Sequence, residues 1–375
     1  MQQEMMAYIQ AHQQEAFDLL VELAQIPAPS HHEERRAQYC KEWLERQGAQ
    51  GVYIDEALNI VYPLGSMEGP LVVYMAHSDV VFPDREKLPL QIENGRIYCP
   101  GIGDDTANVA ALMTVAKYIA QKQIQPTGTG VLLVINACEE GLGNLKGSRR
   151  IMRDYGDRIT EWISLDGQYS TCVNKAVGSK RYRIEIKTEG GHSYSNFGNR
   201  NAIACLASMI DALYAMKVPA KGKTTYNVGA ISGGTSVNTI AQQAEMLYEF
   251  RSDERESLEV MQAHLDAAVA FYRAKGIEVN VELVGDRPCS GEVDSALEKQ
   301  LMDRAMQAVH KHYGVELAYR SGSTDCNIPL SMGIPAVCLG CYKGAGAHTR
   351  EEYVEIDSLL PGLGLAFEMI MHHFE

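Results

Sequence analysis

The chain has 375 residues, which is long for one ordinary domain and predicts two, each large enough to bury a core. Hydrophobic residues make up 46% and charged residues 22%, the balance of a globular protein, and no apolar run approaches the roughly 18 residues of a membrane-spanning helix. The formal net charge of −14 argues against nucleic acid, whose phosphates attract clusters of Lys and Arg, and against anionic membranes.

The N-terminal segment and the cysteines favour a cytoplasmic protein. Residues 1–20 are polar and acidic, are predicted to be helical, and lack the basic and apolar regions of a signal peptide. The nine cysteines are an odd number in a long chain, so we interpret them as free thiols in a reducing compartment. Cys338 and Cys341 have redox or zinc spacing, but without a second pair or nearby histidines a structural role is favoured.

The first half of the chain alternates predicted helices and buried strands. Helices are expected at 35–48 and at 105–122, the second with Asp105 or Thr106 near its N-cap, and strands at 70–76, 130–137 and 161–166. This alternation predicts an α/β fold in which a mainly parallel sheet lies between helices.

The pattern changes near Gly178, where strands begin to alternate polar and apolar residues. The expected order is strand 180–187, helix 201–216, strands 224–231 and 241–251, helix 254–275 and strand 277–284. This order predicts an α+β sandwich inserted at 179–293. The α/β pattern then resumes with a helix at 295–313, a strand at 335–339 and a helix at 357–373, so the first domain would comprise 1–178 and 294–375.

Histidine and carboxylate side chains follow four of these strands or loops. His77 and Asp79 come after strand 70–76, Glu139 and Glu140 after strand 130–137, and Asp166 at the end of strand 161–166. Asp104 and Asp105 lie at the end of the loop that leads into the helix expected at 105–122. Each motif alone has a structural alternative: an ion pair, a helix cap, a solvated loop or a turn. However, ligands collect at the carboxyl ends of strands in open α/β sheets, and imidazole with carboxylate binds zinc, cobalt or manganese. Together the motifs therefore predict one metal centre.

In their order along the chain, these motifs resemble the co-catalytic dizinc peptidase family of peptidase T, carboxypeptidase G, aminoacylase and succinyl-diaminopimelate desuccinylase. The resemblance is carried by His77-x-Asp79, Gly103-Asp104-Asp105, Glu139-Glu140, Asp166-Gly167 and a late His348, and by the runs 190–193, 233–238, 322–325 and 333–335. It extends over nearly the whole chain and is closest to the peptidase T-like di- and tripeptidases. It implies a catalytic domain of 1–178 and 294–375, an inserted lid or dimerisation domain of 179–293, and a homodimer formed through the insertion.

The resemblance also implies a role for each site residue. The ligands of two divalent ions, zinc first with cobalt or manganese as alternatives, would be His77, Asp104, Glu140, Asp166 and His348, with Asp104 rather than Asp105 as the bridge. Glu139 would be the general base for a water that both metals share, Asp79 would orient His77, and His192 would stabilise the oxyanion, reaching across from the partner subunit. The implied substrate contacts are Asn238, Arg251, Gly322, Ser323 and Thr324.

The expected function is hydrolysis of amide bonds in short peptides by a di- or tripeptidase of the aminopeptidase type. Asp166 favours the peptidases, because carboxypeptidase G-like members tend to have Glu there. Three alternative functions stay open: an N-acyl amino acid deacylase or desuccinylase with the same site, an inactive binding protein on this fold, and a thiol enzyme that uses Cys138. One residue departs from the resemblance: Thr106 stands where the family often has Lys, which removes a positive charge near the centre.

Overall fold

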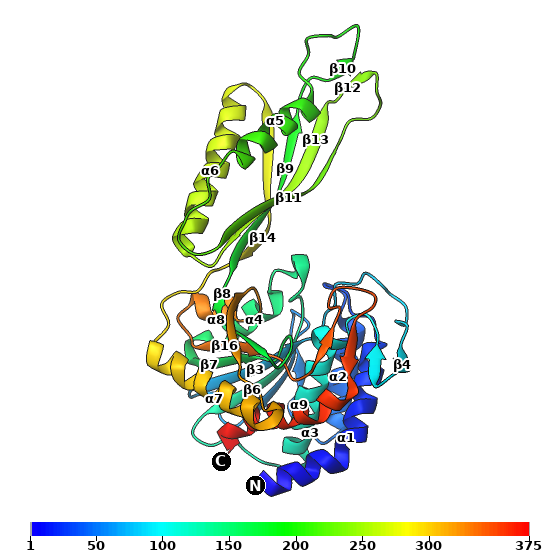
Figure 1. Cartoon of the computed structure of the whole chain (residues 1–375), viewed down its shortest axis with the longest axis vertical. Coiled ribbons are helices and arrows are strands. Elements are labelled where there is room, and N and C mark those ends of the chain that lie inside the picture. The colour runs from blue at the N-terminus through cyan, green and yellow to red at the C-terminus, as the bar shows by residue number, and fades with distance from the viewer. Residues whose placement is uncertain (1, 375) are drawn as a thin grey trace. The chain divides into compact units, whose positions relative to one another are not determined.

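The computed structural model describes residues 2–374, which divide into two compact units (Figure 1). The first unit is the described chain up to Ala176 together with Gly291 onward, and the second is Val177–Ser290. Each unit has a hydrophobic core of its own: two clusters of buried side chains belong to the first unit and a third belongs to the second.

An eight-stranded sheet forms the centre of the first unit, in the order β1-β2-β6-β3-β7-β16-β8-β15. The strands are β1 (Tyr53–Ile54), β2 (Ile60–Leu64), β3 (Leu71–His77), β6 (Gly130–Asn136), β7 (Ile159–Ser164), β8 (Thr171–Ala176), β15 (Ala318–Gly322) and β16 (Ala336–Leu339). The central strands β6, β3, β7 and β16 are parallel, whereas β1 and β2 at one edge are antiparallel. The predicted α/β fold with a mainly parallel sheet is confirmed.

Both faces of this sheet are covered by helices because its strands are apolar on both sides. Val72 and Tyr74 of β3 belong to the cluster with α1 (Gln2–Ala24), α2 (Glu34–Arg46), α3 (Asn108–Lys122), α7 (Ser295–Tyr313) and α9 (Leu359–Met371). Val73 and Met75 belong to the cluster with α4 (Lys146–Tyr155) and α8 (Asn327–Ser331). Successive side chains of a strand point to opposite faces, so a strand buried on both faces is continuously apolar, as the run 70–76 is.

A smaller sheet, which the sequence did not predict, carries loops that matter for the site. Its order is β17-β18-β5-β4, with β4 (Gln91–Glu93), β5 (Arg96–Tyr98), β17 (Gly344–Ala345) and β18 (Tyr353–Glu355). The strands are short, with two or three residues each, and so leave little periodicity to detect.

The second unit is an antiparallel sheet in the order β11-β13-β9-β14 with α5 (Ala202–Tyr214) and α6 (Arg255–Ala274) packed on one face (Figure 1). Its strands are β9 (Gly178–Lys187), β11 (Thr224–Gly233), β13 (Gln243–Ser252) and β14 (Glu278–Arg287), and a two-strand ladder joins β10 (Gly191–His192) to β12 (Thr239–Ile240). The alternating pattern follows from this arrangement, since Tyr182, Ile184 and Ile186 face the helices and the residues between them do not. The expected inserted α+β fold is therefore confirmed.

The helix expected at 105–122 begins later than predicted, at Asn108. Residues Ile102–Ala107 form an irregular turn, η1, in which Asp104 and Asp105 are not helical. Neither Asp105 nor Thr106 caps α3, because the Asp105 carboxylate accepts from the His77 backbone N–H and the Asn108 side chain, and the Thr106 hydroxyl donates to the Gly101 carbonyl. The capping prediction was wrong because other hydrogen bonds engage both side chains.

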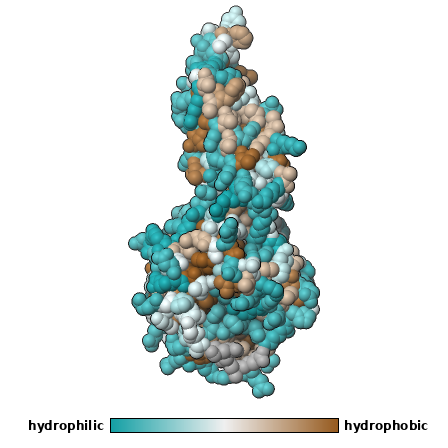
Figure 2. Space-filling model, turned by 90° about the vertical axis from the view of Figure 1, so that its left-hand side faces the viewer, coloured by the Kyte–Doolittle hydropathy of each residue, from teal (hydrophilic) through white to brown (hydrophobic). Residues whose placement is uncertain are grey.

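The visible surface in Figure 2 is mostly hydrophilic, with hydrophobic residues in small, separate groups. Among the described residues, no helix combines the length and the apolar character that crossing a membrane requires.

We expect Asp294→Ala to lower the free energy of unfolding of the first unit by about 1 kcal/mol. The Asp294 carboxylate accepts hydrogen bonds from the backbone N–H groups of Ala296 (2.8 Å) and Leu297 (3.1 Å) in the first turn of α7, and alanine cannot accept them. Urea denaturation followed by tryptophan fluorescence measures the change, since Trp43 and Trp162 both lie in this unit. Asp294→Asn keeps an acceptor oxygen and should lose much less; an equal loss would contradict the capping role.

Candidate metal centre

The candidate ligands gather where three adjacent parallel strands end. His77 is the last residue of β3, Glu140 follows β6 after a short turn, and Asp166 lies just beyond β7. Asp104 comes from η1 and His348 from the loop between β17 and β18. These side chains lie close together, as the argument from strand ends expects, because the carboxyl ends of parallel strands meet at one edge of a sheet.

Asp104 lies between two groups of potential ligands. One group contains His77, Asp104, Asp105 and Asp166, and the other contains Asp104, Glu140 and His348; within each group the donor atoms lie within 4.8 Å of one another. Asp104 Oδ1 is 3.0 Å from His77 Nε2, and Asp104 Oδ2 is 3.1 Å from His348 Nε2. One carboxylate thus presents one oxygen to each group, which is the geometry that a bridging ligand needs.

The donor set and its spacing fit divalent transition metals. Imidazole nitrogens with carboxylate oxygens suit zinc, cobalt or manganese. Zinc bonds of about 2.0–2.1 Å place two donors of one tetrahedral ion roughly 3.3 Å apart. The contacts of Asp104 with both histidines, and the 3.0 Å between His348 Nε2 and Glu140 Oε1, are close to that separation.

Asp105 has partners that hold its carboxylate away from a bridging role. Its Oδ2 accepts from the His77 backbone N–H (2.9 Å) and its Oδ1 accepts from Asn108 Nδ2 (2.6 Å). Asp105 is also completely buried, whereas the Asp104 side chain is 17% exposed. These contacts favour Asp104 over Asp105 as the shared ligand.

Asp79 fixes the backbone that carries Glu139 and Glu140. Its carboxylate accepts from both of their N–H groups, at 2.9 and 3.0 Å, and from the Ser30 hydroxyl at 2.6 Å. The nearest oxygen to His77 Nδ1 is the backbone carbonyl of Asp79 at 3.0 Å, while the carboxylate lies 3.5 Å away. Asp79 therefore contacts His77 mainly through its backbone carbonyl, and its carboxylate holds the backbone N–H groups of both glutamates.

Glu352 and Asn108 hold the same loops, and sequence reasoning missed both. The buried Glu352 carboxylate accepts from the backbone N–H groups of Gly101 (2.7 Å), Gly103 (2.9 Å) and Asp104 (2.7 Å). Besides Asp105, the Asn108 side chain bonds the Gly167 carbonyl (3.1 Å) and the Cys341 N–H (2.7 Å). Of the two, only Glu352 could have been suspected from the sequence, because it is an acidic residue four positions after the candidate ligand His348.

Burial and mutual repulsion shift the pKa values of the candidate ligands. Burial, together with the charge of Asp104, raises the pKa of Asp166 to about 7. Hydrogen bonds to Asp104 and Glu140 raise the pKa of His348 to about 10. Burial opposes protonation of His77, yet the surrounding carboxylates, Asp105 first, raise its pKa well above the ordinary value. Without metal the centre therefore holds protons on these groups near neutral pH.

A family model describing peptidase family M20/M25/M40 matches residues 73–372, which is most of the chain and the range in which all five candidate ligands lie. The chain belongs to this family. Its members are hydrolases, so the chain is a hydrolase of the metallopeptidase and amidohydrolase type.

Three relatives illustrate the range within the M20 family. Succinyl-diaminopimelate desuccinylase of Corynebacterium glutamicum is 25% identical, with 90% of this chain and 91% of the relative covered. The structure of a tripeptidase from Staphylococcus aureus has a TM-score of 0.77 at 25% identity, covering 96% of this chain and 97% of that one. The YXEP protein of Bacillus subtilis, a dinuclear metal binding peptidase, shares the fold at 16% identity, with a TM-score of 0.64 and coverage of 98% and 100%.

The other predicted site residues of this M20 chain fall into two sets. His192, Asn238 and Arg251 belong to the second unit. There His192 Nδ1 accepts from the N–H groups of Tyr194 and Ser195, at 3.3 and 3.4 Å, and the Arg251 guanidinium pairs with Glu249 in two contacts of 3.0 Å. The Asn238 side chain bonds the Ser236 hydroxyl at 3.0 Å.

Gly322, Ser323 and Thr324 lie in the first unit, at the end of β15 and just before α8. Thr324 is buried, its N–H donates to Asn327 Oδ1 (2.9 Å), and its hydroxyl oxygen accepts from the Cys326 N–H (3.2 Å). Thr324 thus has a structural role at the start of α8. The next residue, Asp325, is fully buried and accepts from Asn136 Nδ2 at 2.6 Å and from the Ser148 hydroxyl, which ties it to the end of β6.

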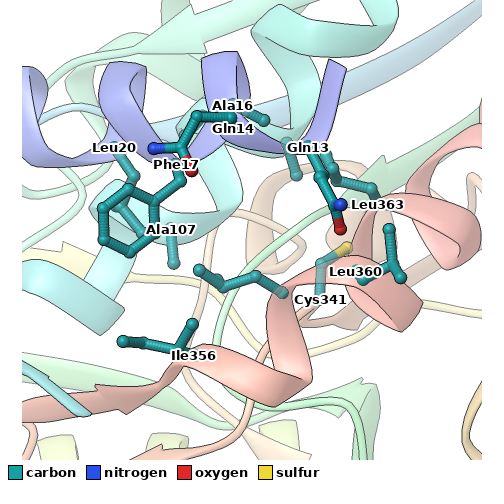
Figure 3. Close-up of a pocket in the computed structure, with 13 residues that line it drawn as sticks. Gln13, Gln14, Ala16, Phe17, Leu20, Ala107, Cys341, Ile356, Leu360 and Leu363 are labelled. Atoms are coloured by element: carbon teal, nitrogen blue, oxygen red, sulfur yellow. The ribbon is translucent and has the colours of Figure 1, made fainter. Parts of the chain in front are cut away.

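A cavity of about 350 Å³ in the first unit is separate from this centre (Figure 3). It lies among α1, the start of α3 and α9, and its lining includes Gln13, Phe17, Leu20, Ala107, Ile356 and Leu360. None of the candidate ligands lines it, and its walls are mainly apolar, so it does not have the chemistry of the metal centre.

We expect divalent metal to stabilise the protein more at high pH than at low pH. The pKa of Asp166 is raised to about 7 in the folded state, so the metal-free fold keeps a proton there that the unfolded chain has already released. The stability that this proton contributes is lost as the pH rises through about 7. A metal ion displaces such protons, so its affinity increases with pH. The difference in Tm between metal-loaded and EDTA-treated protein should grow from about pH 5.5 to about pH 8. A constant or shrinking difference would argue against these residues as ligands.

Proposed function

We propose that this M20 hydrolase is a two-metal di- or tripeptidase of the aminopeptidase type. The proposed ligands are His77 and Asp166 for one ion, Glu140 and His348 for the other, and Asp104 for both. The observation that carries the proposal is the placement of the two Asp104 oxygens at 3.0 and 3.1 Å from the two imidazoles. We propose zinc as the metal, with cobalt or manganese as alternatives.

When bound, the two ions would supply Lewis-acid chemistry, lowering the pKa of water and polarising the scissile carbonyl. Glu139 would act as general base, taking a proton from the attacking water and returning it to the leaving nitrogen. Its position supports this role, because Glu139 forms a group of potential ligands with His77 and Glu140 and its backbone N–H is fixed by Asp79. Glu139 is also buried, at 6% exposure, which strengthens its electrostatic contacts.

The second unit would supply the remaining contacts. We propose that the chain forms a homodimer through this unit, and that His192 of one protomer stabilises the oxyanion at the other's centre. Arg251 is proposed to bind a substrate carboxylate, for which a guanidinium is suited. Its pairing with Glu249 means that a substrate would have to compete with that carboxylate. Asn238, Gly322, Ser323 and Thr324 complete the proposed substrate contacts, and a cytoplasmic location remains part of the proposal.

A deacylase or desuccinylase is the second candidate, since a desuccinylase is 25% identical over nearly the whole chain. The same metal centre and general base would cleave either bond, so the discrimination lies in the substrate contacts. The tripeptidase similarity favours short peptides over N-acyl amino acids. A binding protein without activity is disfavoured because Glu139 and all five proposed ligands are present.

We expect Glu139→Gln to reduce kcat by about 10²–10⁴-fold while leaving both metals bound, because an amide cannot accept the proton. Hydrolysis rates together with metal content after gel filtration measure the two effects. Glu42→Gln, an exposed change in α2, is the matched control and should keep full activity. Unchanged turnover in Glu139→Gln would overturn the assigned role.

A substrate panel separates the two candidate functions. Chelated enzyme is supplied with zinc, cobalt or manganese and given dipeptides, tripeptides, and N-acetyl and N-succinyl amino acids. We expect cleavage of peptides with a free N-terminus at a higher kcat/KM than that of any N-acyl substrate. The reverse order would establish the deacylase, and no cleavage with any metal would remove the proposed activity.

A further inference from the structure

Arg36 of α2 is a buried cation next to the candidate metal centre. The residue is 1% exposed, and burial lowers the pKa of its guanidinium to about 10. A buried charge is costly unless hydrogen bonds and opposite charges compensate it. Nε and Nη2 donate to the Ile26 carbonyl at 3.1 and 2.6 Å, which satisfies one side of the guanidinium.

The other side of the guanidinium contacts two of the loops that carry proposed ligands. Nη1 donates to the Ser78 carbonyl at 2.8 Å and to the Thr106 hydroxyl at 3.3 Å. Ser78 directly follows His77, and Thr106 is two residues after Asp104. The Thr106 hydroxyl in turn donates to the Gly101 carbonyl at 2.5 Å, within the same turn. One side chain therefore joins the end of β3 to η1.

We propose that Arg36 is a positioning residue of the metal centre and supplies a buried positive charge there from α2. The side chain at position 106 is uncharged, and the Thr106 hydroxyl accepts a hydrogen bond from the Arg36 guanidinium. The rigid fork of Arg36 sets the distance between the His77 loop and the Asp104 turn. Its fixed charge offsets part of the surrounding carboxylate charge. This inference rests on the proposed metal centre.

Arg36 and Thr106 are in direct contact in a buried place, so a charge introduced at one position acts on the other. A Lys side chain at 106 would bring its ammonium group against the Arg36 guanidinium in a buried space, where like charges repel strongly. With an uncharged side chain at 36, the same ammonium would have room and could donate to the Ser78 carbonyl. Arg36→Met and Thr106→Lys should therefore each be harmful alone and partly correct each other when combined.

The test compares Arg36→Met, Arg36→Lys, Thr106→Lys and the double variant Arg36→Met/Thr106→Lys with the unsubstituted full chain. Zinc affinity is measured by competition with a chromophoric chelator, and Tm is measured on EDTA-treated protein. We expect each of Arg36→Met and Thr106→Lys to weaken zinc binding by about tenfold or more, and Arg36→Lys to weaken it less. The double variant should recover to within about threefold of the unsubstituted chain, since contacting residues couple.

Arg304→Met is the matched control. Arg304 is a largely buried arginine of the same unit that pairs with Glu161 and contacts none of the proposed ligands. We expect it to lower Tm without changing zinc affinity.

Two results would overturn the role of Arg36. One is a double variant that binds zinc more weakly than either single variant. The other is an Arg36→Met or Arg36→Lys protein that loses Tm but keeps its zinc affinity, as Arg304→Met should. If the unsubstituted chain binds no divalent metal, the proposed metal centre fails together with Arg36. If it binds metal and hydrolyses peptides while the variants keep its affinity, the role of Arg36 alone fails.

Discussion

The Asp104 carboxylate lies between two imidazoles that are far apart in the sequence, His77 at the end of β3 and His348 in a late loop. Its two oxygens can contact both imidazoles only if the distance from η1 to each histidine stays constant. Much of the surrounding structure meets that requirement. The parallel strands bring His77, Glu140 and Asp166 to one edge of the sheet, and the small sheet β17-β18-β5-β4 brings the His348 loop to the same place.

Buried hydrogen bonds hold these loops in position. Glu352 accepts three backbone N–H groups of the segment that leads to Asp104. The Asp79 carboxylate accepts hydrogen bonds from the backbone N–H groups of Glu139 and Glu140. The Asn108 side chain links Asp105 to the loop after Asp166. Arg36 adds a guanidinium bonded to both the Ser78 carbonyl and Thr106. Hydrogen bonds to charged groups are stronger than neutral ones and are strengthened further by burial, so each of them stabilises the position of its loop.

So many carboxylates in one buried place are costly without cations. Burial and repulsion raise the pKa values of Asp166 and Glu352 to about 7, and the carboxylates raise those of both histidines. Protons therefore compensate the charge in the metal-free chain, whereas divalent ions would do so in the proposed enzyme. Arg36 differs from both, because its guanidinium is part of the chain and stays protonated near neutral pH in either state.

The sequence by itself determined the α/β fold, the inserted α+β unit and the neighbourhood of the site. These follow from local patterns, since apolar runs mark buried strands, alternation marks strands with one wet face, and parallel strand ends converge. Only the tertiary structure decided which Asp104 oxygen meets which imidazole, why Asp105 is occupied elsewhere, and that Asp105 and Thr106 do not cap α3. Arg36 and Thr106 lie 70 residues apart, and Glu352 lies 248 residues from Asp104. Hydrogen bonds between such distant residues leave no periodicity or spacing in the sequence, because folding alone brings them together.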